Sequence, residues 1–216
     1  MITILLVDDH AVVRDGLRLL LETQSDFQVV GDADNGREAV YQVNQHCPNV
    51  VILDIAMPDL NGIEAMRQIR AACPETQVII LSMHATGSYI IQALQAGANG
   101  YLLKAAAGSE VINAIRAVQS GQRYMSQKII DTVINTYLSQ PEILEGRDPL
   151  ARLSSREREI LQLVVEGKSS VEIAQVLAIS PNTVDTYRSR LMQKLGISDL
   201  PGLVKFAIQR GLISLE

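Results

Sequence analysis

Short apolar runs alternate with longer amphipathic stretches over residues 1–120. The runs consist mainly of valine, isoleucine and leucine, which is typical of strands buried on both faces of a parallel sheet. Between the runs, apolar residues recur at helical spacing. The pattern predicts strands at residues 2–7, 27–31, 50–53, 78–81 and 100–103, and helices at 12–21, 37–45, 61–72, 88–96 and 110–119. This alternation predicts an α/β fold, a doubly wound domain around a five-stranded parallel sheet.

The pattern changes at Gly121. Residues 121–150 are predicted to form a linker that is partly helical, at 128–138, and then rich in proline, glycine and polar residues. Residues 151–216 carry only helical patterns and predict a second, all-α domain of four helices. The first of these is expected to begin after Ser154 and end at Gly167, and the others to span 170–177, 181–195 and 200–210.

Two helix starts in the second domain carry capping signals. Ser154 is a predicted N-cap residue, and Glu157, three residues on, would complete a capping box. Ser180 is a second predicted N-cap, and Pro181 after it suits the first position of a helix. These signals fix the expected starts of two helices.

Charge also distinguishes the last 66 residues, 151–216, from the rest of the chain. The 216 residues are 47% hydrophobic and carry a formal net charge of -5, which argues against a uniformly basic nucleic-acid-binding protein. Residues 1–150 hold 10 Lys and Arg against 17 Asp and Glu, whereas residues 151–216 hold 9 against 7. The opposite signs suggest that the two domains have different roles.

Features of secreted or membrane proteins are missing from the sequence. Its apolar runs are far shorter than the ~20 residues needed to cross a bilayer, and its start, MITILLVDD, lacks the basic region of a signal peptide. Cys47 and Cys73 are too few for a disulfide framework, so both are predicted to be reduced thiols at helix ends. The protein is predicted to be cytoplasmic.

Polar residues stand where four of the predicted strands end. They are Asp8 and Asp9, Asp54, Ser82 and Lys104. A single aspartate after a strand is usually a helix cap, but the carboxyl ends of parallel strands share one edge of a sheet, where ligands bind. Carboxylates crowded together stay ionised only beside a cation, and oxygen ligands without Cys or His favour Mg²⁺. Such a site suits attack of one carboxylate on phosphorus, giving an acyl phosphate.

Four motifs resemble the receiver domain of two-component response regulators. They are LLVDDH at residues 5–10, DIAMPDLNG at 54–62, LS at 81–82 and YLLK at 101–104. The resemblance covers residues 1–120 and implies a flavodoxin-like receiver fold. It also implies that the domain assists only its own Mg²⁺-dependent phosphorylation and dephosphorylation and is not an enzyme acting on external substrates.

The resemblance assigns a role to each site residue. Asp54 would be the phosphoacceptor. Asp9, Asp54 and the backbone carbonyl of Ala56 would bind Mg²⁺, with Asp8 acting through a water molecule. Ser82 and Lys104 would contact the phosphoryl group, and Tyr101 would be an aromatic switch that turns inward when Ser82 moves toward the phosphate.

Helices 170–177 and 181–195, separated by a short turn, have helix-turn-helix proportions. Ala174 and Val184 are expected to be buried between the two helices. The second helix would enter the major groove of DNA with its polar face, and nearby basic residues would contact phosphates. The predicted DNA-binding residues are Lys168, Asn182, Thr183, Asp185, Thr186, Arg188, Ser189, Arg190 and Lys194, with Arg156 as a flanking candidate.

This segment resembles the LuxR-type DNA-binding domain. The motifs are LSSREREIL at 153–161, GKSSVEIA at 167–174, SPNTVDTY at 180–187 and KLGI at 194–197. With the receiver, the chain resembles the NarL/FixJ class of response regulators. That class implies a sensor histidine kinase, double-stranded DNA and a second copy of the chain as partners, RNA polymerase as a further candidate, and no membrane. The last helix would mediate dimerisation once the receiver is phosphorylated.

Several positions depart from the family pattern. Asn61 stands where relatives often have Asp, Ala105 follows Lys104 where Pro or Asp is usual, and residues 85–88 lack acidic residues. Asp185 replaces the usual Lys on the groove-facing side. A carboxylate there can accept a hydrogen bond from a cytosine amino group, so altered base preference is expected.

Three other functions remain open at this point. A Mg²⁺-dependent phosphatase or phosphotransferase would usually have a second Asp where Ala56 stands. A nucleotide-binding α/β protein would need glycines in the turn at residues 8–11, which has none. A DNA-binding regulator whose receiver works without phosphate is disfavoured by the complete acidic site.

Overall fold

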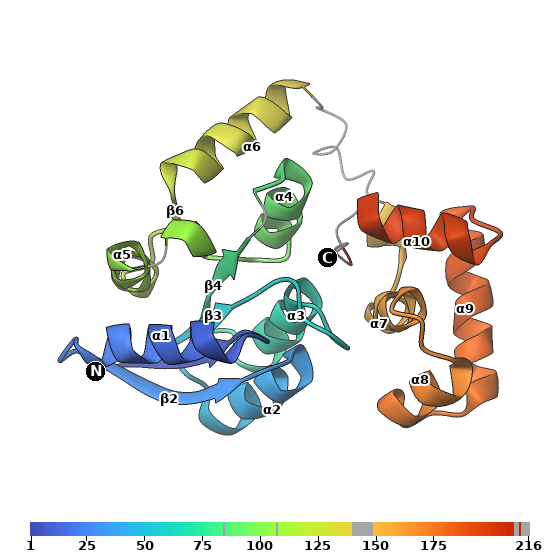
Figure 1. The fold of residues 1–216 in the computed structure, drawn as a ribbon, viewed down its shortest axis with the longest axis horizontal. Coiled ribbons are helices and arrows are strands. Elements are labelled where there is room, and N and C mark those ends of the chain that lie inside the picture. Colours follow the sequence, from blue (N-terminus) through green and yellow to red (C-terminus); the bar gives the residue numbers. More distant parts are fainter. Residues whose placement is uncertain (84, 107, 140–148, 210–211, 213–216) are drawn as a thin grey trace. The chain divides into compact units, whose positions relative to one another are not determined.

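The computed structural model describes residues 1–83, 85–106, 108–139, 149–209 and 212, in two compact units. The first unit, Met1–Ser139, alternates strands and helices (Figure 1). Its elements are β1 (Ile2–Val7), α1 (Ala11–Glu22), β2 (Phe27–Ala33), α2 (Gly36–His46), β3 (Val50–Leu53), α3 (Gly62–Ala72), β4 (Gln77–Ser82), α4 (Gly87–Gln95), β5 (Gly100–Leu103), α5 (Ser109–Gln119), β6 (Tyr124–Met125) and α6 (Gln127–Ser139). The predicted α/β fold is confirmed.

One parallel sheet forms the centre of this unit, with the strand order β2-β1-β3-β4-β5-β6. Apolar residues of α1 and α5 cover one face, and those of α2, α3, α4 and α6 cover the other. The prediction of five strands is corrected to six in the part of the chain that the structure describes. The additional strand, β6, has only two residues, which is too short to leave a hydrophobic pattern in the sequence.

Helix α6 is the helix predicted within the linker. It packs on the first unit, because Ile129 is fully buried in the same apolar cluster as the residues of α4. The proline- and glycine-containing part of the predicted linker, at residues 140–148, lies outside the described residues. The first part of the predicted linker is therefore packed on the first unit as helix α6.

The second unit is all helical, as predicted. After a short 3-10 turn, Pro149–Arg152, it contains α7 (Ser155–Val165), α8 (Ser170–Leu177), α9 (Pro181–Leu195) and α10 (Leu200–Gln209). Ser154 and Glu157 form the predicted capping box, and Ser180 caps α9 with Pro181 in its first turn. Ala174 and Val184 are buried in one apolar cluster, as expected. The predicted last residue of α10, Arg210, lies outside the described part.

The prediction of two reduced cysteines is wrong. Cys47 and Cys73, at the C-terminal caps of α2 and α3, form a disulfide across a Cα–Cα distance of 5.8 Å. The two helices pack side by side on the same face of the sheet and bring their ends together. Local sequence could not reveal this pairing, because 26 residues separate the two cysteines.

Reduction of this disulfide is expected to destabilise the first unit. Closing a loop with a sequence separation of 26 restricts the unfolded chain, and such a cross-link contributes about 3 kcal/mol to the free energy of unfolding. Urea unfolding followed by circular dichroism, with and without dithiothreitol, measures the loss. A Cys47→Ala variant is the control and should not respond to the reductant. Equal stability of the wild-type protein in both buffers would contradict the prediction.

Candidate functional site

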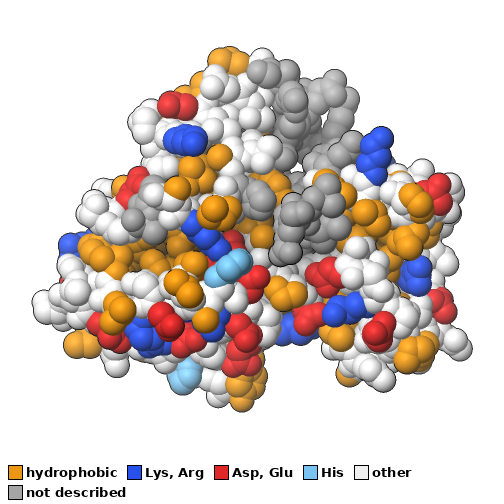
Figure 2. Space-filling model, in the orientation of Figure 1, with side chains coloured by type: hydrophobic (Ala, Val, Ile, Leu, Met, Phe, Trp, Pro, Cys, Tyr) orange, Lys and Arg blue, Asp and Glu red, His pale blue; other side chains and the backbone are white. Residues whose placement is uncertain are grey.

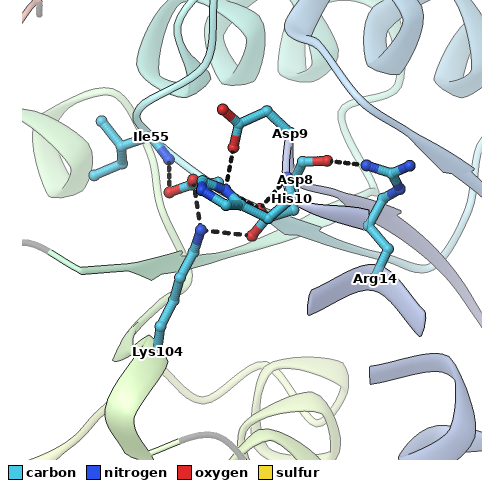
Figure 3. Close-up of polar contacts among 7 residues, drawn as sticks. Asp8, Asp9, His10, Arg14, Ile55 and Lys104 are labelled. Atoms are coloured by element: carbon cyan, nitrogen blue, oxygen red, sulfur yellow. Dashed lines mark hydrogen bonds and ion pairs between the residues drawn. The ribbon is translucent and has the colours of Figure 1, made fainter. Parts of the chain in front are cut away.

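The polar residues predicted at the strand ends meet at one edge of the sheet. Asp8 follows β1, Asp54 follows β3, and Lys104 follows β5. The Lys104 Nζ atom lies 2.7 Å from Asp8 Oδ2 and 2.7 Å from Asp54 Oδ2 (Figure 3). The side chains of Asp8 and Asp54 are 3% and 4% exposed, so both carboxylates are buried, with one ammonium group between them. Asp8, Asp9, Asp54 and Lys104 are together called the pocket.

Asp9 and His10 form the open side of this pocket. The Asp9 side chain is 32% exposed, and its Oδ1 lies 2.6 Å from Nδ1 of His10. The same His10 nitrogen lies 3.2 Å from Asp8 Oδ1. The charge of Asp9 raises the pKa of His10 above its ordinary value. Sequence reasoning missed His10, although its place next to two aspartates was a visible signal.

Burial and the lysine act in opposite directions on Asp54. Burial raises the pKa of the Asp54 carboxyl, the Lys104 ammonium lowers it, and the charge of Asp8 raises it, with an upward net shift. Burial by itself lowers the pKa of Lys104, but hydrogen bonds to Asp54 and Asp8 outweigh that effect, so the pKa of Lys104 is raised. Lys104 is therefore charged at neutral pH, and one cation faces several carboxylates.

The loop after Asp54 is held close to the pocket. The backbone N–H of Ile55 donates to Asp54 Oδ1 over 2.7 Å, which fixes the carboxylate. A Cβ atom on Gly62 would lie 1.9 Å from the Asp54 carbonyl oxygen, so only glycine fits there. Asn61 caps α3 by accepting a hydrogen bond from Glu64 N at 3.0 Å. Asn61, which departs from the family pattern, thus caps the start of α3.

The site fits a hard divalent cation. One ligand atom each from Asp8, Asp9, His10 and Asp54 can be chosen so that all lie within 4.8 Å of one another. Three of the four residues offer carboxylate oxygens, which are the donors that Mg²⁺ prefers. A cation there would offset the charge that Lys104 leaves uncompensated.

Ser82 and Tyr101 lie deeper, on the side of the sheet that α4 and α6 cover. Both residues are fully buried. The Tyr101 hydroxyl is hydrogen-bonded to Ser82, and its ring belongs to the apolar cluster of α4. Burial raises the pKa of Tyr101, so the hydroxyl keeps its proton. The aromatic ring therefore occupies an inward position in this structure.

The predicted DNA-binding residues of the second unit lie mainly on the outside of α9. Asn182, Asp185, Thr186, Ser189 and Arg190 are exposed, whereas Thr183, Arg188 and Lys168 are partly buried. Acidic and basic side chains lie among one another on the face of this unit that Figure 2 shows. This distribution agrees with the small charge excess of residues 151–216.

Asp185 is tied to the first turn of α8. Its Oδ1 accepts a hydrogen bond from the Ser170 hydroxyl at 2.7 Å, and Ser170 Oγ in turn accepts one from Arg188 Nη1 at 3.1 Å. The carboxylate and the guanidinium group are thus held on either side of one hydroxyl. Sequence reasoning did not single out Ser170.

Lys194 has a structural partner. Its Nζ lies 2.6 Å from Oε2 of Glu157, whose side chain is 4% exposed. The same carboxylate oxygen accepts the Ser154 backbone N–H at 2.8 Å in the capping box of α7. Burial by itself raises the pKa of Glu157, but Lys194 and Ser154 outweigh it and hold the pKa below the ordinary 4.5. Lys194 thus links α9 to the start of α7.

Replacing Glu157 by glutamine is expected to destabilise the second unit in a pH-dependent manner. Because its pKa is lower in the folded state, ionised Glu157 stabilises the fold above pH 4.5 and loses this effect as the pH falls below that value. We expect a cost of about 1–2 kcal/mol at pH 7, measured by amide hydrogen exchange in α7 and α9.

A lysine variant tests the same pair. Lys194→Met should show the same trend with pH, and Arg190→Met, on the exposed side of α9, should not. A deficit for Glu157→Gln that is equally large at pH 7 and pH 3.5 would contradict the role of the ionised carboxylate.

Comparisons with known proteins identify the family. Residues 4–116 match the family model of the response regulator receiver domain, and residues 151–207 match that of the luxR family of bacterial regulatory proteins. The chain is 40% identical to the response regulator UvrY of Escherichia coli K12, over 100% of this chain and 98% of that one. It is 36% identical to the oxygen regulatory protein NreC of Staphylococcus epidermidis RP62A, over 97% and 98%.

Solved structures of response regulators are also similar to this chain. A LuxR-family response regulator from Aurantimonas sp. SI85-9A1 is 34% identical, with a TM-score of 0.62 over 64% of this chain and 99% of that one. RcsB of Salmonella typhimurium is 25% identical, with a TM-score of 0.60 over 95% and 97%. The chain therefore belongs to the response regulators. Its receiver followed by a LuxR-type domain is the arrangement of the NarL/FixJ class, whose members are transcriptional regulators and not classical enzymes.

Proposed function

We propose that this protein is a transcription factor controlled by phosphorylation of Asp54. A sensor histidine kinase would supply the phosphoryl group, and phosphorylation would control dimerisation and sequence-specific binding to double-stranded DNA. The observation that carries the proposal is the buried Asp54 carboxylate, held 2.7 Å from Lys104 beside a second buried aspartate. The proposal places the protein in the cytoplasm with its DNA. In the described part of the chain, every helix is too short or too polar to span a membrane.

The proposed reaction uses the pocket as follows. An Asp54 carboxylate oxygen attacks the phosphorus of a phosphohistidine, so that a P–O bond forms, the P–N bond breaks and the imidazole takes up a proton. Lys104 Nζ and Ser82 Oγ would donate hydrogen bonds to the phosphoryl oxygens. Asp9, Asp54 and the carbonyl of Ala56 would hold Mg²⁺, with Asp8 acting through water. When bound, the ion neutralises charge on the carboxylates and the phosphoryl group.

The units would divide this work. We assign residues 1–120 to the receiver, 121–150 to the linker and 151–216 to the DNA-binding domain, and the division of the chain after Ser139 supports a boundary within the linker. In one solved structure, two dimers of RcsB are bound to two parallel DNAs. This supports DNA binding as a dimer here. In the proposed complex, the polar face of α9 would enter the major groove. RNA polymerase is a further candidate partner.

The size of the protein in solution tests the proposal. Gel filtration with light scattering is run with and without Mg²⁺ and beryllofluoride, which mimics a phosphoryl group, on the wild-type protein and on Asp54→Asn. The expected result is a shift from monomer to dimer in the wild-type protein alone. An unchanged size, together with unchanged DNA affinity, would overturn the proposed control by phosphorylation.

Asp185→Lys is expected to strengthen binding to nonspecific DNA. The carboxylate lies on the exposed side of α9, so a lysine there would add a phosphate contact and steepen the salt dependence of log K by about 0.9. Fluorescence anisotropy over a series of salt concentrations measures the slope. Asp15→Lys makes the same charge change at an exposed position of α1 and serves as the control. An unchanged slope would count against Asp185 facing DNA.

A further inference from the structure

One side of α6 is packed tightly against α4. Ile129 is fully buried, and Val133 packs on the same apolar cluster, which includes Tyr89 and Tyr101. Thr136 follows at the next helical turn. These positions share one helix face, since they are four and three residues apart. The other side is open, with Ile134 51% and Leu138 72% exposed. In Figure 1, α6 runs beside α4, in agreement with their contacts.

Gly87, the first residue of α4, allows the closest approach. A Cβ atom on Gly87 would lie 1.9 Å from Thr136 Oγ1, 2.7 Å from its Cβ and 2.8 Å from its Cγ2. No side chain fits at position 87 unless Thr136 or one of the two helices shifts. The Thr136 hydroxyl donates to the Thr132 carbonyl at 2.8 Å, which holds it in this place. The fit between α4 and α6 is therefore specific to a glycine at this position.

The same packing reaches the phosphorylation pocket. Tyr101 lies on the side of the sheet covered by α4 and α6, and Met125, just before α6, pairs with it in the sheet. The Tyr101 hydroxyl is hydrogen-bonded to Ser82, whose strand leads into the segment before α4. A phosphoryl group on Asp54 would compete for the Ser82 hydroxyl and leave the buried tyrosine hydroxyl without this partner.

We propose that α6 is a clasp on α4 that phosphorylation of Asp54 releases. The inference rests on the proposed function and adds the element that carries the signal. Helix α6 is the last described element before the second unit. Its attachment to α4 therefore holds the described part of the connection, up to Ser139, on the receiver. Withdrawal of Ser82 from Tyr101 loosens the cluster beneath Ile129 and Val133 and frees α6.

Amide hydrogen exchange of the full-length protein tests the clasp, with peptides covering α6 as the readout. Beryllofluoride with Mg²⁺ is expected to raise exchange in α6 at least tenfold in the wild-type protein and to leave Asp54→Asn unchanged. Gly87→Ala is expected to raise it without the mimic. Gly16→Ala is the matched control, because a Cβ atom there meets nothing within 4 Å.

A second pair of variants covers the case in which Gly87→Ala fails to fold. Val133→Ser removes an apolar contact with the cluster and should also raise α6 exchange, whereas Ile134→Ser, on the exposed side, should not. In Gly87→Ala or Val133→Ser, the ratio of the DNA affinity with the mimic to the DNA affinity without it should approach one.

The outcomes separate this inference from the proposed function. A mimic that changes exchange around Asp54 and raises DNA affinity, but leaves α6 unchanged, overturns the clasp and keeps the proposed function. A mimic without effect on any peptide or on DNA affinity overturns both. Equal α6 exchange in Val133→Ser and Ile134→Ser also overturns the clasp.

Discussion

Asp54→Asn is expected to abolish phosphorylation by acetyl phosphate or by a histidine kinase. An amide cannot form the acyl phosphate, and the other pocket carboxylates are poorly placed to replace it. Asp8 is buried against Lys104, and Asp9 is partly exposed beside His10. Intact-mass spectrometry after incubation with Mg²⁺ and acetyl phosphate measures the modification. Asp15→Asn, which changes an exposed carboxylate on α1, should be phosphorylated like the wild-type protein.

Loss of the reaction should not reflect loss of the fold. Asparagine has nearly the shape of aspartate, and burial raises the pKa of Asp54, so its ionised form costs stability at neutral pH. The unfolding free energy of Asp54→Asn is therefore expected to equal or exceed that of the wild-type protein without Mg²⁺. A phosphorylated Asp54→Asn protein would contradict the assignment of this residue as phosphoacceptor.

Lys104→Met is expected to destabilise the first unit strongly in the absence of Mg²⁺. The ammonium group lies 2.7 Å from both Asp8 and Asp54, and all three side chains are at most 9% exposed. Removing one partner of a buried ion pair leaves uncompensated charge and costs about 3–5 kcal/mol. Urea unfolding in EDTA measures the loss, and saturating Mg²⁺ should restore part of it because the cation offsets the same carboxylates.

A surface ion pair provides the control for this prediction. Arg116 and Asp26 lie 3.1 Å apart, with side chains 48% and 46% exposed, and solvent screens such pairs, so that they contribute little to stability. Arg116→Met should therefore have a small effect that does not depend on Mg²⁺. A Lys104→Met protein as stable as the wild type in EDTA would contradict the proposed charge balance of the pocket.

The two units also differ in how their site residues act. In the first unit, the predicted residue Lys104 contacts both Asp8 and Asp54 directly. In the second unit, Lys194, a predicted phosphate contact, is paired with the capping box of α7. Lys194 therefore has a structural role in addition to any contact that it makes with DNA. The Lys194→Met variant described above separates its contribution to stability from its contribution to binding.

The sequence by itself determined the regular elements other than β6 and which polar residues stand at the ends of the strands. Apolar runs marked β1, β3, β4 and β5 because strands buried on both faces need continuous apolar residues. Ser154, Glu157, Ser180 and Pro181 marked two helix starts, since caps depend on neighbouring residues alone. The polar residues after the strands could be placed together because parallel strands end at one edge of the sheet.

Only the tertiary structure decided which distant groups meet. The Cys47–Cys73 disulfide, the Lys194–Glu157 pair and the contact of Gly87 with Thr136 each join separate helices. Helical periodicity tells which face of a helix is apolar, but not which neighbour covers it or where two helix ends come together. These contacts depend on the packing of whole elements, and no local pattern in the chain records them.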